Sequence, residues 1–182
     1  MRFRTVTSPH ALETTSVGQV MRRVLYAMVP GIAALCWFFG WGVLINLAIA
    51  TSVALVAEAA MLTVRGKPLA LHLGDYSAVV TAGLLAVALP PLAPWWLTTI
   101  GVLSAIVVAK HLYGGLGYNP FNPAMIGYVV LLISFPREMS TWLIPYGLDQ
   151  PHSMTLLETL QAIFQNTLPA RFAPDALTGA TA

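Results

Sequence analysis

The sequence predicts an all-α integral membrane protein with about five transmembrane or half-membrane helices. Of its 182 residues, 57% are hydrophobic and only 9% are charged, whereas soluble domains carry roughly 25% charged residues. Apolar runs follow one another from Val24 to Phe135, separated by prolines and glycines. The formal net charge of +2 is too small to indicate a nucleic-acid partner. Membrane lipid is therefore the expected surrounding.

Three regions follow from these apolar runs. Residues 1–21 form a polar lead, residues 22–135 a transmembrane helical domain, and residues 136–182 a more polar tail. Because polar residues fill much of the lead before the first long apolar run, we expect no cleaved signal peptide and a first span that is retained.

The first apolar stretch, up to Val64, is too long for one span, which needs about 20 residues. Gly40-Trp41-Gly42 is the expected break, giving helices over about 22–39 and 43–64. Basic residues precede the first helix and follow the second, so both outer ends should face the cytoplasm under the positive-inside rule. These basic residues are Arg22, Arg23, Arg65 and Lys67.

Two shorter apolar runs come next, over 77–89 and 97–109. Each would make about 20 Å of helix, less than a hydrocarbon core of about 30 Å. Two interpretations remain open: a hairpin of short or broken helices, or two full spans whose ends include the intervening prolines and tryptophans. Either one returns the chain to the cytoplasmic side at Lys110.

A broken-helix loop over residues 110–123 follows, within the stretch KHLYGGLGYNPFNPAM. Helix-breaking backbone at a membrane is tolerated where it is buried in protein or lines a cavity. Gly115 and Gly117 would let a ligand approach the backbone, and the amides of Asn119 and Asn122 could bind the mixed edge of a ring. A connecting loop, in which Asn and Pro only make turns, is an equally good interpretation.

The last predicted span covers about 124–135 and exits on the outer face. In the tail, residues 155–168 place leucines and an isoleucine at helical spacing, which predicts a short interfacial helix. By spacing alone, Thr178 to Thr181 is indistinguishable from a flexible loop.

Two carboxylates are candidates for an ion pathway. Glu58 lies inside an apolar run, where an ionisable group is costly and is a functional hypothesis by default; a structural hydrogen-bonding role is the alternative. Asp75 precedes the helix that starts at Ser77, so an N-cap is favoured over a catalytic role. Lys110 and His111 are expected to be interfacial anchors. The remaining histidines and the single cysteine form no metal pattern, so we expect no metal site.

The segment from Lys110 to Pro136, KHLYGGLGYNPFNPAMIGYVVLLISFP, closely resembles the signature of the RnfD/NqrB family. Thr81–Ala86 with the following Leu-Pro-Pro, and the first helix with its Trp37–Gly42 turn, resemble further family segments. The short lead favours the RnfD branch, from the bacterial Rnf complex, over the B subunit of the sodium-pumping NADH:quinone reductase.

The resemblance implies two flavins. Family members carry an FMN joined through its phosphate to a threonine of an Asp-x-x-[Ser/Thr]-Gly-Ala-Thr motif, and residues 175–181 match every fixed position. It thus implies Thr181 as the attachment residue, on the periplasmic side. A riboflavin or similar non-covalent flavin is implied near the 110–123 loop, at Asn119, Phe121 and Asn122. In the covalent FMN motif, the matching positions before Thr181 are Asp175, Thr178, Gly179 and Ala180.

The implied function is that of an electron-transfer subunit in the bacterial inner membrane. It would work with Rnf subunits A, B, C, E and G, moving electrons between ferredoxin and NAD while Na⁺ or H⁺ is translocated. A solute channel or transporter without a redox role, or an orphaned scaffold fragment, are the alternatives. Family members are about twice this long, with a second, inverted set of spans, so we expect this sequence to be an N-terminal half.

Overall fold

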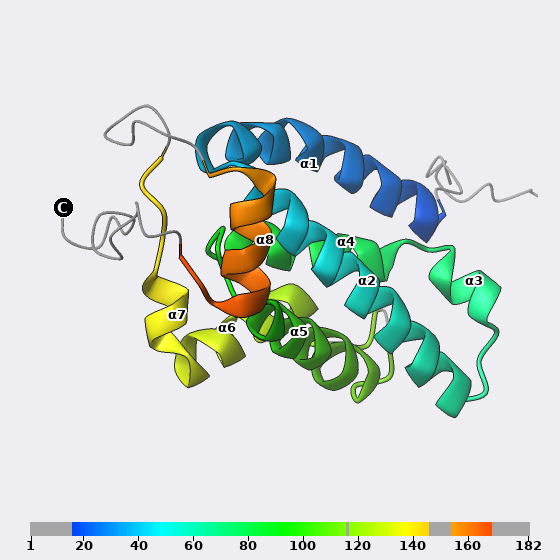
Figure 1. The fold of residues 1–182 in the computed structure, drawn as a ribbon. Helices are drawn as coiled ribbons and strands as arrows, with labels where there is room; N and C mark the ends of the chain where they lie inside the picture. The colour runs from blue at the N-terminus through cyan, green and yellow to red at the C-terminus, as the bar shows by residue number, and fades with distance from the viewer. Residues whose placement is uncertain (1–15, 116, 146–153, 169–182) are drawn as a thin grey trace, which may run out of the picture.

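The computed structural model describes residues 16–115, 117–145 and 154–168, and this part of the chain is helical without a strand (Figure 1). Helices α1 (Val17–Phe39) and α2 (Trp41–Val64) form an antiparallel hairpin. The chain reverses at Gly40, whose φ of 75° is readily adopted by glycine. The predicted break is therefore confirmed.

Helix α1 begins earlier than the sequence predicted. Ser16 accepts a hydrogen bond from the backbone N–H of Gln19, whose side chain in turn accepts from the Ser16 backbone N–H. This reciprocal capping box satisfies two of the free N–H groups at the helix start. Because those polar residues cap the helix, the apolar run alone gave a start five residues too late.

The next helices are α3 (Leu69–Leu73), which was not predicted, and α4 (Ser77–Ala88), which was. Helix α5 (Trp95–Leu103) continues without a break into the π-helix η1 (Ser104–His111). The Leu112 N–H donates to the Val107 carbonyl, five residues earlier, at 3.1 Å, as the wider π-helical turn requires. Helix α4 is thus short, whereas the next helix is longer than its apolar run.

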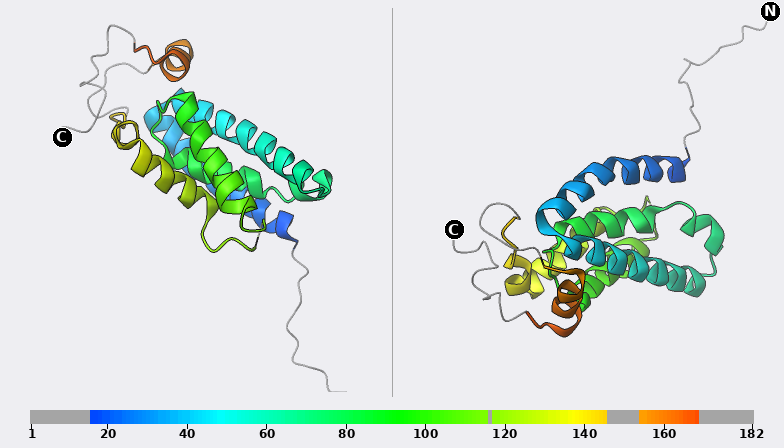
Figure 2. Two further views of the ribbon diagram at one scale, coloured as in Figure 1. Left: turned by 90° about the horizontal axis from the view of Figure 1, so that it is seen from below. Right: turned by 45° about the horizontal axis from the view of Figure 1, so that its top comes forward.

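Three helices complete the described chain: α6 (Pro123–Ser134), α7 (Pro136–Ser140) and α8 (Leu156–Gln165). Helix α8 lies across the other helices rather than along them (Figure 2) and contacts α2. It buries Ala162 and Ile163 while Leu157 and Phe164 are exposed. The predicted tail helix is therefore present; its position at a membrane interface stays a prediction.

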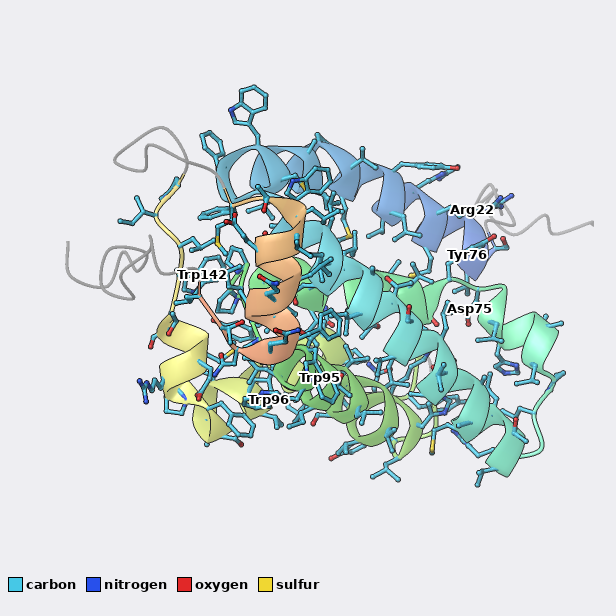
Figure 3. The ribbon with its side chains drawn as sticks, in the orientation of Figure 1. Arg22, Asp75, Tyr76, Trp95, Trp96 and Trp142 are labelled. Carbon is cyan, nitrogen blue, oxygen red and sulfur yellow. The ribbon has the colours of Figure 1, made fainter. Side chains whose placement is uncertain are left out.

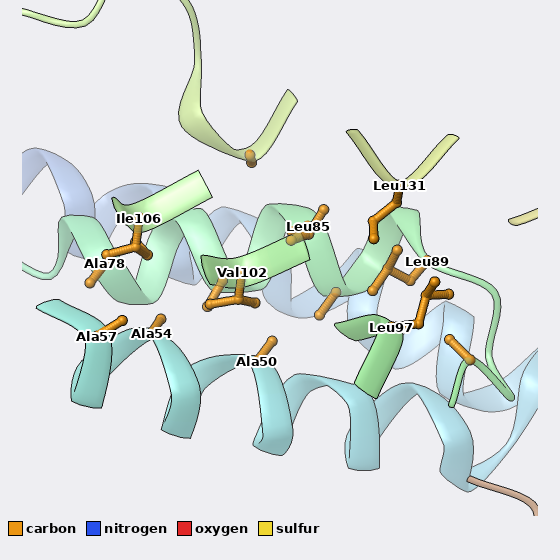
Figure 4. Packing of buried hydrophobic residues seen from close by; sticks show 14 of the residues in the cluster. Ala50, Ala54, Ala57, Ala78, Leu85, Leu89, Leu97, Val102, Ile106 and Leu131 are labelled. Carbon is orange, nitrogen blue, oxygen red and sulfur yellow. The ribbon is translucent and has the colours of Figure 1, made fainter. Parts of the chain in front are cut away.

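The core is built largely from small side chains. Three alanines of α2 face α4 and the α5–η1 helix, where leucine, valine and isoleucine fill the remaining space (Figure 4). Small residues allow helix backbones to approach closely, as membrane helices commonly do. The residues labelled in Figure 4 are Ala50, Ala54, Ala57, Ala78, Leu85, Leu89, Leu97, Val102, Ile106 and Leu131.

Helices α1 and α2 are long and apolar enough to cross a membrane, with 23 and 24 residues. Their most apolar windows are only 0% and 28% buried in the described chain, unlike the core helix of a soluble protein. The other apolar helices are shorter than 18 residues. The structure therefore agrees with an all-α membrane protein, without confirming five spans or an inverted repeat.

The helix order gives the molecule two chemically different ends. At what we call the basic end, α1 and α4 begin while α2 and η1 end; Arg22, Asp75 and Tyr76 lie there (Figure 3). At the opposite, aromatic end, Trp96 packs edge-on against Phe135 with ring centroids 5.1 Å apart. Trp95, Trp96 and Trp142 are all found there.

Candidate functional site

A buried ion cluster lies near the basic end. Lys110 Nζ lies 2.8 Å from Glu58 Oε1, and His111 Nε2 lies 3.0 Å from Glu58 Oε2. Glu58 comes from α2, and the two basic residues come from the last turn of η1. All three residues are at most 5% exposed. The prediction that Lys110 and His111 are interfacial anchors is therefore wrong.

The cause of this error is that their partner is remote in sequence. An unpaired lysine at the end of an apolar run would extend to the interface. Here a carboxylate 52 residues away compensates the buried ammonium, and a buried charge is retained in a protein only when it is paired in this way. Complementary charges in two separate apolar runs were the signal that could have indicated the pair.

Hydrogen bonds extend the cluster to α4. Lys110 Nζ donates to Ser77 Oγ at 2.8 Å, and Ser77 Oγ donates to Asp75 Oδ1 at 2.5 Å. Asp75 Oδ1 also accepts from the Ser77 backbone N–H at 2.7 Å. Asp75 thus accepts from the first backbone N–H of α4, but from one position before the N-cap, which is Tyr76. The sequence therefore predicted the capping interaction but placed the N-cap one residue too early.

On its other side the cluster reaches the end of α2. Arg65 Nη1 lies 3.4 Å from His111 Nδ1 and donates to the His111 carbonyl at 3.2 Å. A guanidinium can only donate, so Nδ1 must accept and the ring proton belongs on Nε2, facing Glu58. Both Glu58 oxygens are therefore engaged, and an ion binding there would have to displace one of its partners.

The glycine loop folds back onto this arginine. Arg65 Nη2 donates to the Gly114 carbonyl at 3.2 Å, and the Gly115 N–H donates to the Lys110 carbonyl at 2.9 Å. Gly114, Gly115 and Gly117 have φ values of 111°, 104° and 88°, a region in which side chains with a Cβ are strained. The break that the sequence predicted is thus a tight glycine turn at the end of η1.

The two amides of the loop have local partners. Asn122 Oδ1 accepts from the Ala124 N–H at 2.9 Å and caps α6, while Asn119 Nδ2 donates to the Phe121 carbonyl at 2.7 Å. Phe121 is 66% exposed. The structure therefore supports the turn-forming role of both amides. Among the described residues, Asn119 Oδ1 and Asn122 Nδ2 have no hydrogen-bond partner, so each amide has a polar atom available to a ligand.

A cavity of about 540 Å³ opens beside the ion cluster. Of the residues predicted from the sequence, Glu58, Asp75 and Gly115 line it; Asn119, Phe121 and Asn122 do not. Its charged and histidine side chains are Arg22, Glu58, Arg65, Lys67, His72, Asp75, Lys110 and His111. No group of three or more metal-binding side chains occurs among the described residues.

A second cavity, of about 270 Å³, lies at the aromatic end between the α1–α2 turn and α8. Trp37, Phe39 and Trp41 line it, together with Leu143 and Met154. The predicted FMN motif lies outside the described residues; its positions are Asp175, Thr178, Gly179, Ala180 and Thr181.

One buried polar site was missed from the sequence. The fully buried Asn46 donates from Nδ2 to the carbonyls of Pro90 and Pro91, both at 3.1 Å, and its Oδ1 accepts from Thr98 Oγ1 at 3.2 Å. These bonds hold the proline loop between α4 and α5 against α2. An asparagine within an apolar run was the available signal.

Comparison with known proteins gives the family. Residues 4–182 match the model of the NQR2, RnfD, RnfE family. The chain belongs to this family. It is 56% identical over 181 residues to the D subunit of the ion-translocating oxidoreductase complex of Alcanivorax borkumensis. It is 54% identical over 164 residues to the proteins of the same name from Salmonella paratyphi B and Salmonella typhimurium.

Membership of the NQR2, RnfD, RnfE family confirms the resemblance seen in the sequence. The matches cover 100% and 90% of this chain, but only 50% and 46% of the Alcanivorax and Salmonella proteins. The chain thus spans about half the length of these relatives and corresponds to their N-terminal half.

Proposed function

We propose that this chain is the N-terminal half of a membrane electron-transfer subunit in an Rnf-type complex. The observation that carries the proposal is the family match over residues 4–182, together with relatives named as the D subunit of an ion-translocating oxidoreductase complex. The partners are then Rnf subunits A, B, C, E and G. The complex exchanges electrons between ferredoxin and NAD, coupled to movement of Na⁺ or H⁺.

Thr181 is the proposed attachment residue of a covalent FMN. The supporting observation is the sequence Asp175 to Thr181, which has an aspartate, a threonine, Gly-Ala and a final threonine at the required spacing. FMN, when bound, supplies the redox chemistry, while the protein places it and tunes its surroundings.

The second proposed cofactor is a non-covalent flavin at the glycine loop. Its support is the exposed ring of Phe121 together with one polar atom each of Asn119 and Asn122 that has no partner among the described residues. A flavin ring needs both an aromatic surface and hydrogen-bonding groups. Gly115 and Gly117 leave the backbone accessible in the same loop.

The proposed orientation puts the basic end in the cytoplasm of a bacterium and the aromatic end at the periplasmic face of the inner membrane. Arg22 and Arg23 lie near the start of α1, and Arg65 and Lys67 follow the end of α2 at the same end of the molecule. This supports the assignment through the positive-inside rule. Helix α6 then leads away from that end, so that Thr181 is periplasmic.

Glu58 and Asp75 remain the proposed ion-pathway residues. The two carboxylates differ in how many of their oxygens are already bound by other groups in the described chain. A cation at Glu58 competes with Lys110 and His111, whereas Asp75 uses only Oδ1 in hydrogen bonds within the described chain.

The test of the covalent flavin uses the full-length protein made in a host that contains the flavin transferase. The purified protein is denatured, separated on a gel and viewed under ultraviolet light. We expect a fluorescent band for wild type, none for Thr181→Ala, and an unchanged band for Thr178→Ser, which preserves the motif. Fluorescence that survives Thr181→Ala would refute the attachment residue, and a dark wild-type band would favour the channel or transporter alternative.

A further inference from the structure

The cavity at the basic end is formed by five separate elements. The start of α1, the end of α2, α3, the α3–α4 turn and the end of η1 with its glycine loop all contribute to its wall. Its volume of about 540 Å³ is within the range of roughly 300–1,000 Å³ found for small-molecule sites. The cavity thus depends on the packing of segments that are far apart in the sequence.

The charges around this cavity are unbalanced. Two arginines and two lysines line it, against two carboxylates. Glu58 is fully buried against Lys110 and His111, so its negative charge is already compensated. Among the described lining residues, the remaining cations are Arg22, Arg65 and Lys67, and Asp75 is the one other carboxylate. The cavity therefore favours an anion by charge.

Hydrogen-bond donors also lie among the lining residues. Lys110 has three N–H donors, and its described partners Glu58 and Ser77 take two of them. The Lys67 ammonium forms no salt bridge within the described residues. The first residues of the 23-residue helix α1, Val17 and Gly18, lie at the cavity wall, and a helix start adds positive potential there.

We propose that this cavity binds a phosphate ester, namely the headgroup of an anionic phospholipid from the cytoplasmic leaflet. Basic pockets between transmembrane helices on the cytoplasmic side recognise such headgroups, and the adjoining surface of α1 is apolar enough to contact acyl chains. A soluble phosphate compound shares the recognised chemistry. The site shares Gly115 with the loop proposed for the non-covalent flavin, but its basic residues Arg22 and Lys67 are not among the flavin residues. Its assignment to the cytoplasmic leaflet rests on the proposed orientation.

The test measures thermal unfolding of the purified full-length protein in detergent by tryptophan fluorescence. Phosphatidylglycerol, phosphatidylcholine and inorganic phosphate are titrated separately, and lipid adducts are counted by native mass spectrometry. We expect phosphatidylglycerol to raise Tm in a saturable way, phosphatidylcholine to have little effect, and one phosphatidylglycerol to remain bound.

The chain offers a matched control at neighbouring positions. Arg22 lines the cavity, whereas Arg23, also exposed and next in sequence, does not. We expect Arg22→Gln and Lys67→Gln each to raise the half-saturating lipid concentration by about tenfold, the effect of one charge-assisted hydrogen bond. Arg23→Gln should leave it unchanged. Arg22→Gln also removes the contact with Tyr76, where the guanidinium lies 6.0 Å from the ring centroid. The Lys67→Gln variant tests the cavity without changing that contact.

The outcomes separate the possible sources. Saturation by inorganic phosphate but not by phosphatidylglycerol, with the same dependence on Arg22 and Lys67, would support the phosphate site with a soluble ligand. If Arg23→Gln raised the half-saturating lipid concentration as much as Arg22→Gln, lipid binding would depend only on general surface charge. This result would overturn the proposal. Absence of any Tm rise, or equal response to phosphatidylcholine, would also overturn it, whatever the flavin gel shows.

Discussion

Glu58 and Lys110, 52 residues apart in the sequence, form a nearly solvent-free ion pair with 2.8 Å between Oε1 and Nζ. The pair joins helix α2 of the α1–α2 hairpin to the end of the π-helix. Removing one partner of a buried pair leaves the other charge buried without compensation, which is strongly destabilising. Replacing both partners by apolar residues of similar size has a much smaller effect on stability. The packing of the end of η1 against α2 is therefore expected to depend on this pair being intact.

Replacing Glu58 by glutamine should destabilise the protein by about 3–5 kcal/mol, because the Lys110 ammonium is left buried without a counter-charge. The double variant Glu58→Gln/Lys110→Met should recover part of this loss, since no buried charge remains. The measurement is reversible chemical or thermal unfolding in detergent.

Glu138→Gln is the matched control, because Glu138 lies in α7 and forms no salt bridge among the described residues. An equal effect of the two glutamine substitutions would contradict a structural role for the Glu58–Lys110 pair.

Alanine substitutions at two glycines separate the effect of close helix packing on stability from the effect of helix propensity. A Cβ on Gly127 would lie 2.5 Å from the Gly101 carbonyl oxygen and 3.1 Å from Ala105 Cβ, whereas a Cβ on Gly31 would meet nothing within 4 Å. We expect Gly127→Ala to destabilise the protein by about 1–3 kcal/mol through overpacking. Gly31→Ala should be neutral or stabilising, because alanine favours a helix by about 1 kcal/mol. Unfolding of both variants in the same detergent decides the point.

Hydrophobicity and helix-breaking residues were enough to predict where most helices lie. The break at Gly40 was predicted, and α4 was placed within one residue at each end. The glycine loop was predicted over 110–123, whereas η1 continues through His111. Helix α3 was missed because its five residues are too few to produce a periodic pattern. Helix α7 was missed because Pro136 was interpreted as the start of an irregular tail, although proline fits the first position of a helix.

The site was predicted only where the chemistry is local. Asp75 and Asn122 act on backbone groups two residues away, so their capping could be anticipated from adjacent sequence. The complementary charges of Glu58 and Lys110 were a signal, but adjacent sequence could not show that they pair, because the pairing depends on how α2 packs against η1. The same applies to Asn46, whose acceptors lie 44 and 45 residues further along the chain.

The Asn46 bonds predict an order of stability. Asn46→Leu leaves the carbonyls of Pro90 and Pro91 and the Thr98 hydroxyl without their partner, at about 1–3 kcal/mol for each buried group that stays unpaired. Thr98→Val breaks only one of the three bonds. We therefore expect unfolding experiments to show a larger loss for Asn46→Leu; the reverse order would mean that water or local movement replaces the asparagine.

The role of Asn122 can be separated into capping and cofactor binding. Asn122→Ala should cost about 1 kcal/mol, because the Ala124 N–H loses its acceptor at the start of α6. Asn122→Ser should keep most of the stability, because serine is also a good N-cap. Serine cannot present the carboxamide that a flavin edge would bind.

Flavin content therefore distinguishes the two roles in the full-length protein. If the amide binds the proposed non-covalent flavin, denatured Asn122→Ser should release no flavin. Its stability, and the fluorescent gel band of the FMN proposed at Thr181, should remain. If Asn122 only caps α6, the serine variant should retain both flavins. Equal loss of stability in the serine and alanine variants would instead show that the cap geometry needs the longer asparagine side chain.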